Sequence, residues 1–484
     1  MSTSNSIARN TTYYTIALII QKILAFIYFS LIARFLGAEN TGKYTYALSF
    51  TTLFAIFIDF GLAPVLIREI AKARHKAQAY ISNVLALKIP LAIITYLLAV
   101  GMINILAAPG ITRSLVYLSA IIMCLDSFSL SFWAVMRGHQ QLKYESMGVV
   151  GMQLITVSCG SLTLFFNLGL IPLMLALVGG SLFNFLFGLF TLKKRLKLDL
   201  LPHYESDTLR TLFKIGIPFA LAGIFNRIYT SLDTVLLSNL AGDAHVGWYS
   251  IPIKITMALQ FLPMAFMAAL FPAMSEYFIS NHDKLKHTFE KAMRYLMIIS
   301  LPVAVGIISL ARPAILAVYT AEYLNSILPL RILMIGLFFL FINFPVGYLL
   351  NACNRQTTNT INMGITVVVS VILNIFLIPR YSYIGASIAS VASTIILFLL
   401  GMRYVPKIIP YSKRYLLKSF IKILIACGFM LTAIYYLRPM ASGIQFLWLV
   451  PIGAFIYFLA LSILGGINRD DIIYIWNSIR SPRS

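Results

Sequence analysis

Fourteen long apolar stretches constrain this chain more than any other feature of its sequence. Each has about 20 residues or more, the length that a helix needs to cross the hydrocarbon core of a bilayer. The stretches cover residues 12–33, 46–67, 81–107, 114–136, 147–166, 170–192, 212–237, 249–274, 293–311, 328–350, 359–378, 383–405, 416–437 and 445–466. Only 11% of the residues are charged, against about 25% in soluble domains. The sequence therefore predicts an all-α polytopic membrane protein with 14 transmembrane helices, whose short loops leave no room for a catalytic domain.

The basic residues predict how these spans are oriented. The net charge of +22 would suggest a nucleic-acid partner on a soluble chain, but here it indicates cytoplasmic loops. If the N-terminus is cytoplasmic, 27 Lys and Arg residues lie in inner segments, including Arg469, Arg480 and Arg483 of the tail. Six lie in outer segments: Arg34, Lys43, Arg113, Arg312, Arg380 and Arg438. This asymmetry places both termini in the cytoplasm.

Two pairs of segments suggest an internal repeat. At an offset of 205 residues, Gly37, Gly42 and Tyr44 of segment 36–46 match Gly242, Gly247 and Tyr249 of segment 241–251. Segments 137–148 and 353–364 both contain an Arg, a Gln and a final Met-Gly. Parallel repeats of this kind are common in transporters. We therefore expect two six-helix repeats, spans 1–6 and 7–12, related by an axis along the membrane normal.

This repeat also predicts the domain organisation. Residues 1–200 are expected to form an N-terminal six-helix bundle, and residues 201–410 a C-terminal one. Residues 411–484 would add transmembrane helices 13 and 14 and a cytoplasmic tail.

Ionisable residues within the spans are the candidate functional residues, because such groups are costly in lipid and normally face the protein interior or water. The basic ones are Lys22, Lys88, Arg227, Lys254 and Arg331, and the acidic ones are Asp59, Asp126 and Asp233. Lys22 and Arg227 are separated by the 205-residue repeat offset, so they are expected at equivalent positions, facing one central cleft. Lys254 and Arg331, near the outer ends of their spans, either line the cleft or extend to the headgroups.

Small hydroxyl residues surround Arg227 on its helix. Thr230, Ser231 and Thr234 follow at spacings of three, four and seven residues, as expected for the wall of a water-filled cavity. The surroundings of Lys22 are more apolar. Either cation could instead be paired with one of the three carboxylates, which are candidates for an ion pair or for a coupling site. Lys88, in the inner third of its span, is expected to extend toward the headgroups.

No sequence motif indicates a cofactor, a metal site or a nucleophile. Segment 37–44 resembles a phosphate-binding loop, but Tyr44 occupies the position where Ser or Thr would hold Mg²⁺. The four cysteines show no metal-ligand spacing. All six histidines lie in loops, so none suggests a proton relay within a span.

Several segments, in order, resemble the polysaccharide transporter family of the multidrug/oligosaccharidyl-lipid/polysaccharide superfamily. They are Leu31 to Tyr44; Asp59-Phe-Gly-Leu with Ile67-Arg68-Glu69; Asp233 to Tyr249; Phe271-Pro-Ala-Met-Ser; and Asn374 to Pro379 with Ile384-Gly-Ala-Ser387. The resemblance covers most of residues 5–400 and implies two bundles in a V around a central cavity. It also implies a flippase that moves polyprenyl-diphosphate-linked oligosaccharide from the inner to the outer leaflet by alternating access.

This resemblance sets further expectations. Cations in a wet cleft suit a diphosphate, and spans 13 and 14 could form a lipid-facing groove. The location would be the inner membrane of a prokaryote, for O-antigen or other surface polysaccharide synthesis. The partners would be membrane lipids, the lipid-linked oligosaccharide and a polysaccharide polymerase or ligase, with no nucleic acid. No cofactor is expected, and coupling to Na⁺ or H⁺ is left open.

Three alternatives remain. A multidrug antiporter of the same superfamily would usually have twelve spans and a cavity dominated by carboxylates. A lipid II flippase would have an arginine-rich start to span 1, but segment 16–25 contains only Lys22. A polysaccharide polymerase or ligase would need a long outer loop. A non-enzymatic flippase fits better than any of these.

Overall fold

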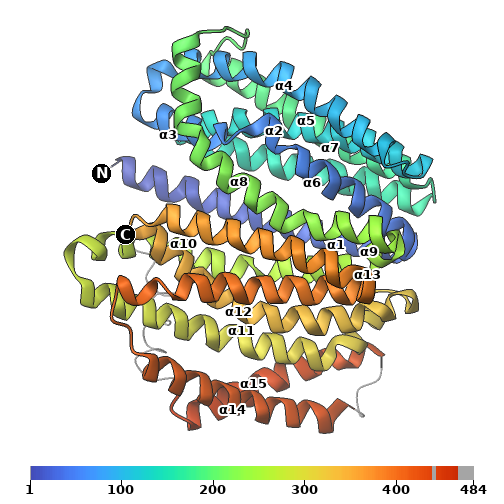
Figure 1. Ribbon diagram of the computed structural model, residues 1–484, viewed down its shortest axis with the longest axis vertical. Coiled ribbons are helices and arrows are strands. Elements are labelled where there is room, and N and C mark those ends of the chain that lie inside the picture. Colours follow the sequence, from blue (N-terminus) through green and yellow to red (C-terminus); the bar gives the residue numbers. More distant parts are fainter. Residues whose placement is uncertain (1, 439–442, 467–484) are drawn as a thin grey trace. The chain divides into compact units, whose positions relative to one another are not determined.

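The computed structural model is all-helical over the residues that it describes, 2–438 and 443–466, with side chains placed for 14–438 and 445–466. The tail with Arg469, Arg480 and Arg483 lies outside the described residues. Figure 1 shows the helices. They are α1 (Ser2–Phe54), α2 (Ile56–Asp59), α3 (Leu62–Lys72), α4 (Ala77–Ile105), α5 (Gly110–Gly138), α6 (Leu142–Phe165), α7 (Leu170–Thr191), α8 (Ser206–Ala241), α9 (Asp243–Leu259), α10 (Phe261–Ser280), α11 (His282–Val318), α12 (Ile327–Ala352), α13 (Gln356–Met402), α14 (Lys413–Leu437) and α15 (Leu449–Ile463).

The chain forms two compact units. The first runs to Ser250 and includes Asn374–Tyr383, and the second comprises Ile251–Leu373 and the chain from Ile384 onward. Helix α8 belongs to the first unit, where it packs against α1 and α3. The pocket described below lies entirely in this unit.

Twelve helical stretches within the described residues are long and apolar enough to cross a membrane. Two of them, Tyr14–Asp59 with 46 residues and Gln356–Lys407 with 52, each cover two of the expected spans. At 1.5 Å per residue these stretches measure roughly 69 and 78 Å, about twice the thickness of the hydrocarbon core. The chain is therefore a multi-span, all-helical membrane protein, and the count of fourteen crossings stays a prediction.

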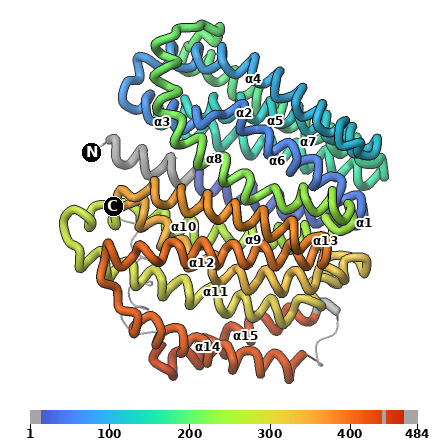
Figure 2. The backbone as a smooth tube through the Cα atoms, viewed as in Figure 1, coloured from blue at the N-terminus to red at the C-terminus, as the bar shows by residue number. Residues whose placement is uncertain are grey.

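Both of these long helices contain a break. In α1 the backbone at Gly37 has φ 74° and ψ 176°, and in α13 Ser382 has φ 50° and ψ −130°. Figures 1 and 2 show α1 reversing direction after its first half, so that its second half returns toward α2. Gly242, which separates α8 from α9, also has a positive φ of 101°. Glycine adopts such angles without the steric cost of a Cβ atom, which explains its presence at both Gly37 and Gly242.

Along part of α4, small side chains face the interior of the first unit and large ones face outward. On α4, Ala92, Thr95 and Ala99 are buried, whereas Ile93 and Leu97 are exposed. Exposed aliphatic side chains of this kind would be unfavourable in water but are compatible with contact to lipid. The small buried residues let neighbouring helices approach closely. Buried residues of α1, α5 and α7 complete this core.

The second unit is likewise a bundle of packed helices. Helix α11 packs against α12 and α14, and α14 packs against α15. A buried polar contact ties α15 to α11: the Tyr457 hydroxyl donates to the backbone oxygen of Ile298 at 2.9 Å. Because a polar group in an apolar interior needs a hydrogen-bond partner, this contact fixes the position of α15.

Candidate functional site

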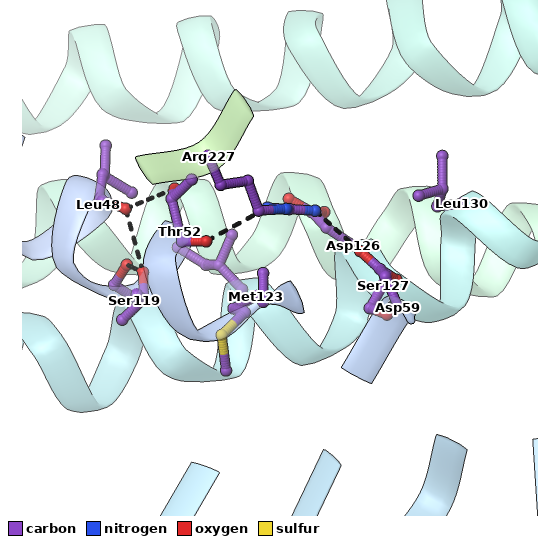
Figure 3. A pocket seen from close by; sticks show the side chains of 12 residues that line it. Leu48, Thr52, Asp59, Ser119, Met123, Asp126, Ser127, Leu130 and Arg227 are labelled. Atoms are coloured by element: carbon purple, nitrogen blue, oxygen red, sulfur yellow. Dashed lines mark hydrogen bonds and ion pairs between the residues drawn. The ribbon is translucent and has the colours of Figure 1, made fainter. Parts of the chain in front are cut away.

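A pocket of about 300 Å³ lies inside the first unit, between α1, α2, α5 and α8. Its wall combines hydroxyl groups, two carboxylates and one guanidinium within an otherwise apolar bundle. The polar lining residues are Thr51, Thr52, Ser119, Ser127, Asp59, Asp126 and Arg227. Figure 3 shows Arg227 reaching from α8 between Thr52 and Asp59.

Asp59 stands at the centre of the charged groups because it is bound by two cations. Its Oδ1 accepts from Lys88 Nζ at 2.9 Å, and its Oδ2 accepts from Arg227 Nη2 at 2.8 Å. Ser127 Oγ also donates to Oδ1. Asp59 is the last residue of α2, which ends where Phe60 adopts a left-handed conformation with φ 39°. This short helix therefore presents the carboxylate toward both α4 and α8.

Lys88 is buried completely, with no exposure of its side chain. Its ammonium donates to Asp59, to the backbone oxygen of Ser127 at 2.8 Å and to Ser127 Oγ at 2.9 Å. Three acceptors match the three N–H donors of a lysine. The expectation that Lys88 extends toward the headgroups was wrong, because the side chain lies on the inward-facing stripe of α4 that also carries Val84 and Ala92.

Arg227 differs from Lys88 in that 27% of its side chain remains exposed. Besides Asp59, the guanidinium contacts the backbone oxygen of Thr52 at 3.4 Å through Nη1. A guanidinium has five N–H donors in a planar fork, so Arg227 retains donors that can face the pocket. Of the cations singled out within the spans, this is the one that lines the pocket.

Asp126 lines the same pocket. Its Oδ1 atom is buried and accepts no hydrogen bond within the described part of the chain. Elsewhere on the pocket wall, the Thr51 and Ser119 hydroxyls bind each other at 2.6 Å. Asp126 is therefore a carboxylate with unused hydrogen-bonding capacity at a polar surface.

The hydroxyl residues expected beside Arg227 do not line this pocket. Thr230 donates to its own helix, at the backbone oxygen of Asn226. Ser231 and Thr234 are buried, and the backbone N–H of Thr234 donates to Asp233 at 2.7 Å. Asp233 also accepts from the Tyr249 hydroxyl at 2.6 Å, which joins α8 to α9.

The other candidate cations lie outside the pocket. Lys22 is exposed on α1, and Lys254 and Arg331 are half-buried in the second unit. Arg331 Nε donates to the backbone oxygen of Ile308 at 3.2 Å. The structure brings Arg227 together with Asp59 and Asp126 but does not bring Lys22 to this pocket, so the roles of Lys22, Lys254 and Arg331 stay predictions.

A second, apolar cavity of about 440 Å³ lies in the second unit, between α11, α14 and α15. Its lining is almost wholly aliphatic and aromatic, and includes Pro302, Gly306, Met430, Gly453 and Phe458. Such a surface suits a hydrocarbon chain and offers little to a sugar or a phosphate.

Residues 7–278 match the family model described as "Polysaccharide biosynthesis protein", and residues 218–376 match the MatE model. The fold is that of a superfamily of helical membrane transporters: it is similar to an inward closed conformation of the lipid II flippase MurJ, with a TM-score of 0.77 and 16% identity over 93% of this chain and 98% of that one. The first of the two models covers more than half of the chain. The chain therefore belongs to the polysaccharide biosynthesis protein family, within the multidrug/oligosaccharidyl-lipid/polysaccharide superfamily.

Two relatives illustrate this membership. A putative O-antigen transporter of Shigella flexneri is 25% identical over 402 residues, covering 79% of this chain and 94% of its own. A probable low-salt glycan biosynthesis flippase of Haloferax volcanii is 23% identical over 411 residues, covering 84% of this chain and 85% of its own.

Proposed function

We propose that the protein is a flippase that moves a polyprenyl-diphosphate-linked oligosaccharide from the inner to the outer leaflet of a prokaryotic inner membrane, by alternating access. Family membership supports this proposal, and so do the names of the two relatives. One observation carries the choice of an anionic cargo: a partly exposed Arg227 on the wall of a polar pocket within the membrane-spanning helices.

Each of the two cavities suits a different part of such a cargo. The polar pocket has a volume near the lower end of small-molecule sites, about 300–1,000 Å³. It could hold a charged linkage but not a whole oligosaccharide. Arginine binds phosphate through two parallel hydrogen bonds. The apolar cavity between α11, α14 and α15 suits the polyprenyl chain, as expected for a lipid-facing groove next to the last two spans.

The topology belongs to the same proposal. Fourteen crossings result if Gly37 and Ser382 each divide a long helix into two spans. Both termini would then be cytoplasmic, and residues 1–200 and 201–410 would be the two six-helix repeats, followed by residues 411–484. A reciprocal contact supports the repeat: Gly42 packs on the carbonyl of Asp243, and Gly247 packs on that of Ala38. The 205-residue offset relates each contact to the other.

A coupling cation, H⁺ or Na⁺, would bind at Asp126 in this proposal. Asp59 is occupied by Lys88 and Arg227, and Asp233 is occupied by Tyr249 and Thr234. Asp126 retains a buried, unpartnered oxygen. Neutralising it would leave the two cations Lys88 and Arg227 against the single charge of Asp59, a net positive charge at the pocket that favours entry of an anion.

Reconstituted vesicles test the substrate class. We expect transport of a diphosphate-linked lipid oligosaccharide, and little transport of a neutral lipid glycan with the same sugars and the same tail. Equal transport of both would contradict an anion-dependent flippase. Export of cationic drugs without lipid glycan transport would favour a multidrug antiporter, and activity on lipid II alone would favour a lipid II flippase.

A further inference from the structure

We infer that Asp59 competes with the cargo for Arg227. Asp59 binds Arg227 while the pocket is empty and releases it when a diphosphate binds, and its ion pair with Lys88 stays intact throughout. This inference rests on the proposed function, because it concerns how the same pocket binds and releases an anionic cargo. It assigns Asp59 to setting the affinity of the site and not to contacting the cargo.

The two oxygens of Asp59 are divided between a fixed partner and a releasable one. Oδ1 faces Lys88 and Ser127, and Oδ2 faces Arg227. A second anion could therefore remove Arg227 from Oδ2 without disturbing the contacts of Oδ1. An unpaired carboxylate in a low-dielectric interior would cost too much free energy for this exchange to occur. Because Lys88 stays bound to Oδ1, Asp59 is never left unpaired.

Lys88 is suited to the fixed role. It has no exposed surface, and all three of its donors are used within α2 and α5. To move, it would have to leave several acceptors at once in an apolar environment. Its charge therefore stays with Asp59 through any exchange at Arg227.

Arg227 is suited to the releasable role. Its side chain is partly exposed, and its second contact, to the Thr52 oxygen, is long at 3.4 Å. The fork of a guanidinium fits a phosphate as well as it fits a carboxylate. Exchanging Asp59 Oδ2 for a phosphate oxygen replaces one charge-assisted hydrogen bond with another, so it needs only a small net free energy.

Competition of this kind has two consequences for the cargo. A neutral glycan cannot displace a carboxylate from Arg227, so the pocket selects for the charged linkage. A bound diphosphate is not trapped either, because Asp59 Oδ2 remains within reach to take Arg227 back. Asp59 thus lowers the affinity of the pocket for the cargo and makes release of the cargo faster.

Binding of inorganic pyrophosphate to the purified full-length protein, measured by isothermal titration calorimetry, tests this directly. The double variant Asp59→Asn/Lys88→Met removes the competitor and its fixed partner together. It leaves the net charge unchanged, and replacing a buried ion pair with neutral side chains is often tolerated. We expect pyrophosphate to bind about tenfold more tightly, equivalent to about 1.4 kcal/mol. In vesicles the same variant should flip lipid-linked oligosaccharide more slowly, because release is impaired.

Two control variants separate this effect from others. Asp207→Asn removes an exposed carboxylate from the same helix as Arg227, roughly 30 Å away along its axis. It should leave pyrophosphate affinity unchanged. Adding Arg227→Ala to the double variant should abolish the gain. Lys88→Met alone should weaken pyrophosphate binding, because Asp59 then has only Arg227 as a partner. If the double variant does not fold, Asp59→Asn takes its place: its amide oxygen can still accept from Lys88, and it should bind pyrophosphate more tightly than the wild type.

The outcomes distinguish this inference from the proposed function. If Arg227→Ala abolishes pyrophosphate binding but the double variant binds like the wild type, Asp59 is no competitor and the anion site stands. If Lys88→Met does not weaken binding, the inference is likewise wrong. If pyrophosphate binds tightly but vesicles flip no lipid-linked oligosaccharide, the proposed function fails while the competition at Arg227 holds.

Discussion

At the scale of single residues, the two basic side chains around Asp59 have different roles. Lys88 is enclosed, and removing it would leave a buried carboxylate with one partner fewer. Arg227 is half-buried at the pocket wall. The chemistry of cargo binding therefore concentrates on Arg227, and stability depends more on Lys88.

Replacing Arg227 separates binding from folding. Arg227→Ala should lower flipping by about 10- to 100-fold, since a hydrogen bond to a charged group contributes about 1.5–3 kcal/mol. Because Asp59 keeps Lys88, the variant should remain folded and inserted. Arg227→Lys should recover only part of the activity, because an ammonium cannot form the bidentate contact. Transport in vesicles and thermal unfolding in detergent measure the two effects; wild-type transport by Arg227→Ala would exclude it as a cargo ligand.

Asp126 is the residue at which cation coupling can be tested. If a proton or Na⁺ binds there, Asp126→Asn should make transport insensitive to an imposed pH or Na⁺ gradient, because an amide binds neither as a carboxylate does. Asp233→Asn is a suitable control, since Asp233 already has protein partners. A gradient response that persists in Asp126→Asn would remove Asp126 from the coupling proposal.

At the scale of helices, close backbone packing depends on glycines that match under the repeat offset. A Cβ atom on Gly42 would collide with the Asp243 carbonyl, and one on Gly247 would collide with that of Ala38. Neither carbonyl can move without shifting a helix. The junction of α1 and α9 therefore tolerates no side chain at either glycine.

Alanine substitutions test this junction. Gly42→Ala and Gly247→Ala should each destabilise the protein by about 1–3 kcal/mol, as overpacking does. Gly179→Ala is the matched control, because nothing lies within 4 Å of its Cβ position. It should be neutral or stabilise α7 by up to about 1 kcal/mol. Thermal unfolding in detergent measures all three, and equal stability of the three variants would contradict the close approach.

The apolar cavity can be filled by a substitution. Gly306→Leu would project into the cavity between α11, α14 and α15, where no atom lies within 4 Å of the new Cβ. If the polyprenyl chain binds there, transport should fall while folding is unaffected. Gly428→Leu, on an exposed face of α14 with equally open space, should transport normally. Identical transport by both variants would exclude this cavity from cargo binding.

At the scale of the whole molecule, labelling of single cysteines tests topology. In a variant without Cys124, Cys159, Cys353 and Cys427, Tyr204→Cys should react only from the cytoplasm. Phe166→Cys, Glu39→Cys and Tyr381→Cys should react only from outside, since Gly37 and Ser382 would divide α1 and α13 between two crossings each. All four native side chains are exposed. Labelling of position 39 or 381 from the cytoplasm would contradict fourteen crossings.

The membrane character and helical class could be predicted from sequence because they depend on local properties. Only helices and closed barrels satisfy the backbone in lipid, and an apolar run of about 20 residues selects a helix. Arg227 could be singled out for a similar reason, since an arginine within such a run needs a polar environment. The break in α1 lies at Gly37, one of the glycines that match between the two segments of the internal repeat.

Which charges pair with one another was decided by the tertiary structure alone. Asp59 meets Lys88 and Arg227, 29 and 168 residues further along the chain, only because α2, α4 and α8 converge at one point. Hydropathy could not show that Lys88 points inward, because core and lipid faces of a membrane helix are both apolar. The small residues on its stripe, Ala92 and Ala99, were the available signal. Apolar length is a property of each segment and can be read along the chain, whereas an ion pair requires two side chains to meet in space, which depends on packing.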